Sequence, residues 1–247
     1  MACSQNKKSW TLHQGDALRR LEQLEPESID AIVTDPPYCA GGFTEKQKQA
    51  AVRMGVRGSG TNAEWFVGDN MGTAGLCHLL RSVASESLRL LKPGGSLLAF
   101  CDWRMVAALA PAMESAGLRH QNLLVWDKGS IGLGNGFRPR HELVLHFTKG
   151  GRAPLFYSRS TANLITCKRI SSRKRRHPTE KPVELLRELI EVVSPEGGTI
   201  LDPFAGSGAS GEAALQAGRQ WIGIELSPGF AQGARNRLRA VNTELSA

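Results

Sequence analysis

Short apolar runs alternate along this chain with segments in which apolar residues recur every three or four positions. The runs have the length of buried strands, whereas the three-to-four spacing predicts amphipathic helices. The runs predict seven strands, at residues 10–14, 29–34, 96–100, 122–126, 141–147, 199–201 and 221–224. The helical spacing predicts a turn through Leu18 and Leu21 and helices over residues 76–90, 104–116, 182–193, 209–217 and 228–241. Strands that alternate with helices indicate an α/β fold with a mostly parallel sheet.

Three segments depart from this alternation. Residues 141–147 have no helix before them, so this strand is expected to enter the sheet antiparallel, as a hairpin partner. Residues 39–75 are rich in Gly, Lys and Arg without a sustained period, which predicts a long mobile insertion. Residues 149–176 also have little hydrophobic periodicity. Because the chain has only 247 residues, we predict one domain over residues 1–247 that carries these segments.

Composition narrows the class of protein. Hydrophobic residues make up 41% and charged residues 22%, and no apolar stretch approaches the roughly 20 residues needed to span a bilayer. The first ten residues lack the apolar core of a signal peptide. The five cysteines are widely spaced without a C-x-x-C pair, which indicates reduced thiols in a cytosolic protein rather than disulfides or a zinc site.

The positive charge is concentrated in one place. Six Lys and Arg residues fall within residues 168–176, and without them the net charge of +8 would be +2. A cluster this dense is either a solvated surface or a face that binds phosphate groups. Composition alone leaves both interpretations open.

A distinctive tetrapeptide, Asp35-Pro36-Pro37-Tyr38, follows the predicted strand 29–34. Two prolines fix φ and remove two backbone donors, so the backbone here presents carbonyls that only accept hydrogen bonds. A carboxylate and a carbonyl that accept the protons of a planar –NH2 group would make its nitrogen nucleophilic, while Tyr38 stacks on the base. The alternative is an ordinary Pro-rich turn after a strand.

A second motif follows the predicted strand 199–201. Gly206, Gly208 and Gly211 have the spacing of the dinucleotide fingerprint, and Glu225 lies 19 residues beyond Gly206, where it could accept from ribose hydroxyls. This pattern fits either a nicotinamide dinucleotide or S-adenosylmethionine. Asp202 favours the second, because a carboxylate before the glycines would repel phosphates and attract a sulfonium and an ammonium.

Together the two motifs resemble those of the amino-methyltransferases of DNA, which make N6-methyladenine or N4-methylcytosine. The catalytic motif precedes the cofactor motif, which is similar to the circularly permuted β group of prokaryotes and their phages. Further stretches that resemble the family are Gly15-Asp16, Leu91-Lys92-Pro93-Gly94-Gly95, Phe137-Arg138-Pro139-Arg140-His141-Glu142 and His177-Pro178-Thr179-Glu180-Lys181-Pro182. The resemblance covers nearly the whole chain and implies a single Rossmann-like domain in which strands 199–201 and 29–34 are neighbours.

The resemblance also implies roles for individual residues. The expected catalytic residues are Asp35, Pro36, Pro37 and Tyr38. The residues expected to hold S-adenosylmethionine are Asp16, Asp35, His177, Thr179, Lys181, Asp202, Phe204, Gly206, Ser207, Gly208 and Glu225. Lys181 would pair with the donor's carboxylate, although it could instead merely precede a helix. The residues expected to contact DNA are Arg138, Arg140, Lys168, Arg169, Arg173, Lys174, Arg175 and Arg176, with 149–176 as a short target-recognition segment.

The resulting prediction is an enzyme that methylates double-stranded DNA on the amine of a flipped base. The Asp-headed tetrapeptide is more typical of adenine N6 enzymes in this family, and cytosine N4 is the alternative. A nicotinamide-dependent oxidoreductase, an RNA or protein acceptor and a DNA-binding protein without activity are the remaining alternatives. We expect no metal, no membrane association and a cytoplasmic location in a prokaryotic cell or phage-infected host. Dimers are common in the family, so a homodimer is compatible with the resemblance.

Overall fold

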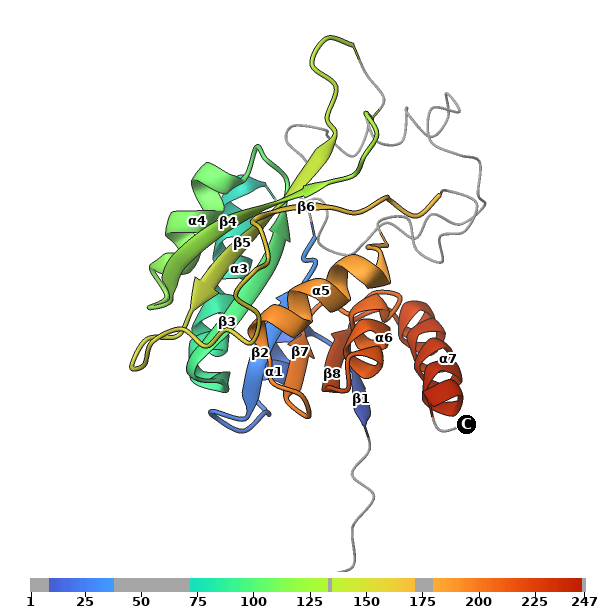
Figure 1. The fold of residues 1–247 in the computed structure, drawn as a ribbon. Helices are drawn as coiled ribbons and strands as arrows, with labels where there is room; N and C mark the ends of the chain where they lie inside the picture. The colour runs from blue at the N-terminus through green and yellow to red at the C-terminus, as the bar shows by residue number, and fades with distance from the viewer. Residues whose placement is uncertain (1–8, 38–71, 133–134, 172–179, 246–247) are drawn as a thin grey trace, which may run out of the picture.

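A central sheet of eight strands organises the chain (Figure 1), and the computed structural model describes residues 9–37, 72–132, 135–171 and 180–245. The order of strands across the sheet is β1-β8-β7-β2-β3-β5-β4-β6. Their bounds are β1 Trp10–Gln14, β2 Ile29–Thr34, β3 Leu91–Cys101, β4 Arg119–Asp127, β5 His141–Thr148, β6 Leu164–Thr166, β7 Thr199–Asp202 and β8 Gln220–Glu225.

The sheet is mostly parallel, and β5 is the antiparallel member. β5 pairs antiparallel with both β3 and β4, while all other neighbouring strands are parallel. The predicted hairpin strand is therefore confirmed. β7 lies directly beside β2 although about 170 residues separate them, with Ala31 opposite Ile200 and Ile32 opposite Leu201. This pairing confirms that the two motifs follow neighbouring strands.

Helices cover both faces of the sheet (Figure 1). One core joins the sheet to α1 Ala17–Leu21, α3 Thr73–Leu90 and α4 Val106–Glu114. The other joins it to α5 Val183–Val193, α6 Ala209–Gln216 and α7 Pro228–Leu245. Successive residues of β3 alternate between the cores, with Leu97 in the first and Leu98 in the second, as the period of a strand requires. None of the helices in the described ranges is long and apolar enough to cross a membrane.

Two local features differ from the predictions. The sheet has eight strands rather than seven, because Leu164–Thr166 adds β6 beside β4. A three-residue strand with one buried side chain, Ile165, has too little alternation to be recognised from sequence. Residues 92–95 fall between the predicted helix 76–90 and the predicted strand 96–100, but they belong to β3. The pairing of β3 with β2 shifts in register between Ile29 and Ala31. The predicted insertion 39–75 also ends earlier, since α3 begins at Thr73.

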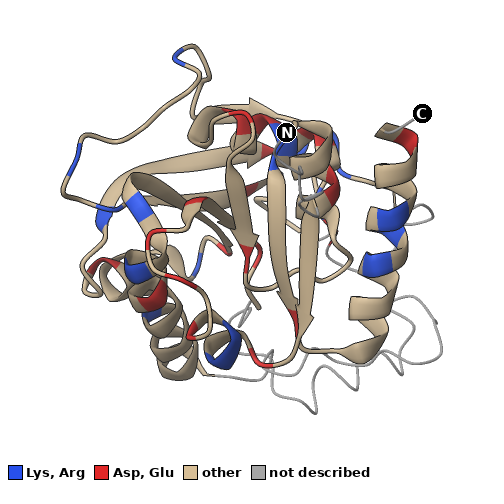
Figure 2. Cartoon of the chain, turned by 90° about the horizontal axis from the view of Figure 1, so that it is seen from below, with Lys and Arg blue, Asp and Glu red and all other residues tan. Residues whose placement is uncertain are grey.

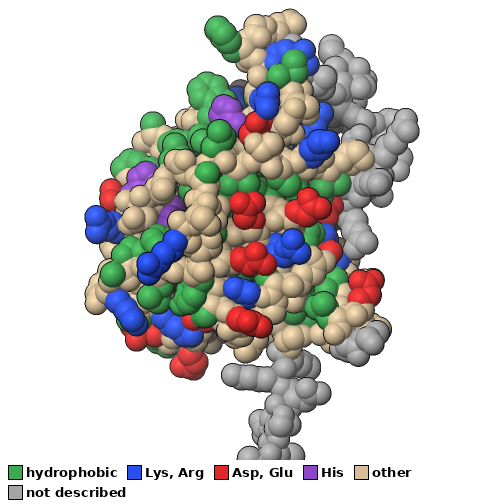
Figure 3. Space-filling view, in the orientation of Figure 1, with side chains coloured by type: hydrophobic (Ala, Val, Ile, Leu, Met, Phe, Trp, Pro, Cys, Tyr) green, Lys and Arg blue, Asp and Glu red, His purple; other side chains and the backbone are tan. Residues whose placement is uncertain are grey.

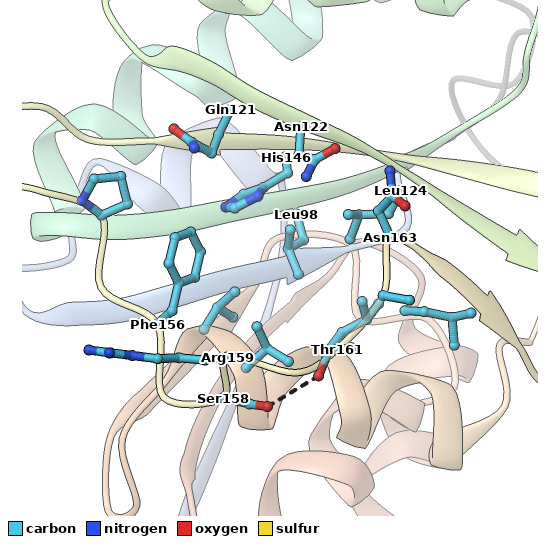
Figure 4. A pocket seen from close by; sticks show the side chains of 16 residues that line it. Leu98, Gln121, Asn122, Leu124, His146, Phe156, Ser158, Arg159, Thr161 and Asn163 are labelled. Carbon is cyan, nitrogen blue, oxygen red and sulfur yellow. Dashed lines mark hydrogen bonds between the residues drawn. The ribbon is translucent and has the colours of Figure 1, made fainter.

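The segment 149–163 crosses the sheet beyond the end of α5. Its backbone is tied to the sheet and to α5 by hydrogen bonds from Leu155 N to Gly94 O, from Tyr157 N to Val192 O and from Val125 N to Asn163 O. A pocket of about 690 Å³ lies between this segment, the sheet and α5 (Figure 4). Its labelled polar side chains include Gln121, Asn122, His146, Thr161 and Asn163. The first half of the predicted recognition segment therefore packs against the sheet and α5.

Candidate active site

Four acids lie at the carboxyl ends of four adjacent strands. Asp16 follows β1, Glu225 ends β8, Asp202 ends β7 and Asp35 follows β2. These strands are parallel and neighbours in the sheet, so their carboxyl ends share one edge. Ligands of open α/β sheets bind outside this edge. The fold thus places the predicted catalytic acid and the predicted cofactor acids along one line.

Asp202 is buried and held by donors of its own chain. Its Oδ1 accepts from Thr34 Oγ1 at 2.7 Å and from the backbone N of Phe204 at 3.0 Å, and its Oδ2 accepts from Ser210 Oγ. Burial raises the pKa of the Asp202 carboxyl to about 6, although these hydrogen bonds from Ser210, Thr34 and Phe204 oppose the shift. Asp202 fixes the turn after β7 and puts a buried charge beneath it, a structural role that the sequence did not reveal.

A pH dependence of donor binding follows from this carboxyl. Since the pKa in the folded state lies above the ordinary 3.8, ionised Asp202 opposes folding and its protonation does not weaken the fold. As pH falls from 7.5 to 5, Asp202 loses its charge, and burial shifts the pKa of Glu225 in the same direction. We expect affinity for S-adenosylmethionine, which is cationic at its sulfonium, to fall through pH 6, as measured by calorimetry. Asp202→Asn should show a flatter profile, and an equally steep profile in that variant would contradict the assignment.

The glycine turn lies between β7 and α6 with a left-handed backbone. Gly206 has φ 50° and Gly208 has φ 76°, a region that residues with a side chain rarely adopt. A Cβ on Gly208 would lie 3.0 Å from the Cβ of Ala234 in α7, and a Cβ on Gly211 would lie 2.8 Å from Leu238. The glycines therefore let α6 and α7 pack closely while the turn stays at the strand edge.

Glu225 binds this turn with one oxygen and the segment after β8 with the other. Its Oε2 accepts from Gly206 N at 2.8 Å and its Oε1 accepts from Ser227 N at 2.8 Å. A carboxylate has about four acceptor positions, so these bonds leave capacity for hydroxyl donors. Next to it, Gly15 N donates to Glu225 O at 2.9 Å, and Asp16 caps α1 by accepting from Arg19 N at 3.1 Å. Asp16 is exposed at the same edge, as the predicted cofactor role requires.

Gly206→Val tests whether a donor molecule passes over this turn. A β-branched residue at φ 50° costs roughly 1–2 kcal/mol, and its side chain would occupy the face where the backbone must approach a ligand. We expect binding of S-adenosylmethionine to become undetectable by calorimetry while the thermal unfolding transition is retained. Gly233→Val in α7 is the matched control, because a Cβ there meets nothing within 4 Å. Normal donor affinity in Gly206→Val would place the cofactor elsewhere.

A buried ion-pair cluster ties the glycine turn to α7. Figure 2 colours basic positions of α7 blue, and one of them, Arg237, is only 7% exposed. Its guanidinium pairs with Glu180 and Glu212 and also donates to Ser207 Oγ at 3.3 Å. The sequence predicted only a basic helix here. The structure shows that Arg237 joins the glycine turn, α6 and the residue preceding Lys181.

Asp35 pairs with the buried ammonium of Lys181. The distance from Lys181 Nζ to Asp35 Oδ2 is 2.6 Å, and Lys181 Nζ lies 3.3 Å from Glu142 Oε2. Burial would lower the pKa of Lys181, but the carboxylates of Asp35 and Glu142 outweigh it and raise that pKa. Lys181 therefore stays charged beside the carboxyl groups of Asp35 and Glu142. The predicted contact of Lys181 with a donor carboxylate stays a prediction, and the geometry adds a second role.

Glu142 extends this network to a second lysine. Lys128 Nζ lies 2.6 Å from Glu142 Oε1. Burial would raise the pKa of Glu142, yet Lys181 and Lys128 together lower it. The sequence pointed to Glu142 only through its place in the family-like stretch 137–142, without a partner. Within the described ranges, no group of three or more His, Cys, Asp or Glu side chains could hold a metal ion.

The described basic residues predicted to contact DNA are exposed near this edge. Arg138 donates to Gly132 O at 2.7 Å, and Arg140 forms a two-point ion pair with Asp127 at 2.7 Å. Lys168 and Arg169 follow β6, which runs parallel to β4 and exits at the same edge as Asp127. Other predicted site residues lie outside the described residues, namely Tyr38, Arg173, Lys174, Arg175, Arg176, His177 and Thr179.

These motifs at one sheet edge are those of an α/β enzyme with a nucleoside-bearing cofactor. Comparison with known proteins shows its family. Residues 29–236 match the DNA methylase family, N6_N4_Mtase. The match covers more than half of the chain, and the chain belongs to this family.

Individual relatives agree with this assignment. YubD of Escherichia coli strain K12 is 33% identical over 228 residues, which cover 92% of this chain and 89% of YubD. The structure of the M1.HpyAVI–SAM complex superposes with a TM-score of 0.66 at 22% identity, over 93% of this chain and 100% of that one. The cytosine-N4-specific PvuII DNA methyltransferase has a TM-score of 0.71 at 17% identity, over 95% of this chain and 91% of that one. These structural similarities support the fold, and they include an enzyme of the cytosine N4 type.

Proposed function

We propose that this protein is an S-adenosylmethionine-dependent DNA methyltransferase that methylates the exocyclic amine of adenine at N6. The observation that carries the proposal is the pairing of Asp35 with Lys181 at the end of β2, one strand away from the glycine turn after β7. Membership of the DNA methylase family removes the support for a nicotinamide-dependent oxidoreductase.

Asp35 supplies the acceptor that a planar amine needs. Its carboxylate and the Pro36 carbonyl accept hydrogen bonds from the two N–H groups of the amine, which draws the nitrogen lone pair out of the ring. Lys181 holds the carboxylate in one position, 2.6 Å away, before any substrate arrives. As the methyl group leaves the sulfonium and bonds to the amine nitrogen, Asp35 would stabilise the positive charge that grows there, and the methylated amine would then release one proton to solvent. Tyr38 is proposed to stack on the base.

The donor site is assigned to the turn after β7 and to its neighbours. S-adenosylmethionine supplies an electrophilic methyl group when it is bound. Glu225, at the end of β8, accepts from the ribose hydroxyls, and Asp16 lies near the adenine end. Phe204, Ser207 and the glycines shape the wall, and Asp202 provides a buried negative charge beneath it. His177, Thr179 and Lys181 are proposed at the methionine end.

DNA is proposed to approach the same edge. The exposed Arg138, Lys168 and Arg169 offer cations to phosphates, while the pairing of Arg140 with Asp127 reduces its contribution. In Figure 3, basic and hydrophobic side chains lie together on the loop that projects at the top of the molecule. The basic residues at 173–176, which follow Lys168 and Arg169 in the sequence, are proposed to bind phosphates as well. Lys and Arg side chains that contact DNA phosphates supply affinity that does not depend on the DNA sequence and that decreases steeply with salt concentration.

The choice of adenine rests on the aspartate that heads the tetrapeptide, and cytosine N4 is the second candidate because PvuII methyltransferase shares the fold. Incubation with S-adenosylmethionine and unmethylated DNA, followed by digestion to nucleosides and mass spectrometry, separates the two. We expect N6-methyladenine. N4-methylcytosine would change the target, and neither product in the presence of confirmed donor binding would contradict DNA as the acceptor.

A further inference from the structure

Trp103 is an exposed indole at the catalytic edge. Of the four tryptophans in the described ranges, Trp126 and Trp221 are buried and Trp10 is half-buried, whereas Trp103 is 61% exposed. Trp103 follows β3, the strand next to β2 and its Asp35. Large aromatic side chains are normally buried, so an exposed one at a functional edge requires a reason.

The indole lies beside an arginine that is held in place. Arg104 forms two hydrogen bonds to Asp102, at 2.9 and 3.1 Å, and its backbone N donates to the same carboxylate at 2.9 Å. The guanidinium carbon of Arg104 lies 5.7 Å from the centre of the Trp103 ring. Asp102 thus holds Arg104, and Arg104 limits the movement of the indole. A flat surface that is ordered before binding loses little entropy when a ligand stacks on it.

The surface is continuous with the catalytic network. Cys101 at the end of β3 pairs with Leu143 of β5, so the next residues of the two strands are Asp102 and Glu142. Glu142 contacts Lys181, which holds Asp35. Trp103 is therefore linked through Glu142 and Lys181 to Asp35, the group proposed to contact the target amine.

On this basis, which rests on the proposed function, we infer that Trp103 is a stacking platform for an unstacked DNA base next to the reacting amine. Every base has a π face that fits an indole. The exposed Arg138, Lys168 and Arg169, which lie at other strand ends of the same sheet edge, could complement the phosphates of the same DNA strand. An apolar protein partner would gain nothing from these cations. Trp103 acts as a positioning residue, because it holds the strand while Asp35 contacts the amine.

The test compares two single-stranded probes of equal length, one of mixed sequence and one with abasic sugars at every position. Stacking of one base on an aromatic side chain corresponds to about a 5- to 160-fold change in affinity. We expect Trp103→Ala to lose that factor for the mixed-sequence probe and to bind the abasic probe as the wild type does. Trp103→Phe should retain most of the affinity, and Asp102→Asn should have an intermediate effect because Arg104 is released.

Leu245→Ala is the matched control, since Leu245 is 57% exposed on α7 and should leave both affinities unchanged. Equal loss of affinity for both probes would overturn the inference. Unchanged DNA binding by Trp103→Ala together with altered sedimentation would also overturn it, because that result indicates that Trp103 makes a contact between copies of the protein. The wild type is assayed for methylated nucleosides in parallel. A wild type that methylates DNA together with an unaffected Trp103→Ala variant overturns the platform alone, whereas a wild type without DNA methylation overturns the proposed function.

Discussion

Asp35→Ala is expected to reduce methyl transfer by about 10³-fold or more while affinity for S-adenosylmethionine changes little. Removal of one fixed hydrogen-bonding group at a site of developing charge lowers turnover by about 10²–10³-fold, and Asp35 combines such a bond with a full charge. Donor binding is proposed to depend mainly on the turn after β7, which the substitution leaves intact. The measurement is single-turnover transfer of labelled methyl groups to DNA, with calorimetry for the donor.

Asp35→Asn provides the matched control for this prediction. It preserves the size of the side chain but removes the charge that pairs with Lys181. We expect a loss close to that of Asp35→Ala, because an amide presents one acceptor oxygen and a competing donor. Turnover near that of the wild type in either variant would show that the amine is activated elsewhere.

Lys181→Met is expected to reduce turnover by about 10²-fold and to change its pH profile. Without the ammonium, the carboxylates of Asp35 and Glu142 face each other in a buried site, and like charges raise the pKa of one of them. The activity of the variant should then increase between pH 6 and 9, a range in which titration of this carboxylate pair should not change the activity of the wild type. The free energy of unfolding should fall by about 3–5 kcal/mol, the usual effect of removing one partner from a buried ion pair.

Two readouts separate the roles of Lys181. If it only positions Asp35, the affinity of Lys181→Met for S-adenosylmethionine stays within a few fold of the wild type. If it also binds the donor's carboxylate, that affinity falls together with turnover. A Lys181→Met variant with an unchanged pH profile and unchanged stability would contradict the network itself. Lys92→Met is a control, since Lys92 pairs with Asp30 at a more exposed position away from the site.

The strands and helices could be predicted because each has a local signal. Residues 31–33 are apolar in succession, as expected for a strand that is buried on both faces. The spacing of Leu186, Leu189, Ile190 and Val193 predicted α5. The glycine turn and the tetrapeptide were also local, because their function requires adjacent residues. β6 was missed since its pairing with β4, rather than its own three residues, makes it a strand.

The partners of the charged residues could not be predicted in the same way. Arg237 was predicted only to lie in the final helix, and it is buried among Glu180, Glu212 and Ser207. Asp202 was expected to face a ligand, and its oxygens accept from Thr34, Ser210 and a backbone amide. The amide of Phe204 is local to Asp202, but Thr34 lies 168 residues from it. Arg237 lies 57 residues from Glu180 and 25 from Glu212, so no short spacing in the chain records these ion pairs.

Most of the strands, the residues that follow their carboxyl ends and the chemistry open to those residues could be predicted from the chain. That Lys181 holds Asp35 across 146 residues of chain, and that Glu142 completes the network, is visible in the folded molecule alone. Local conformation depends on neighbouring residues, whereas an ion pair depends on distance and burial. Both quantities become defined only when the parallel strands bring their ends to one edge.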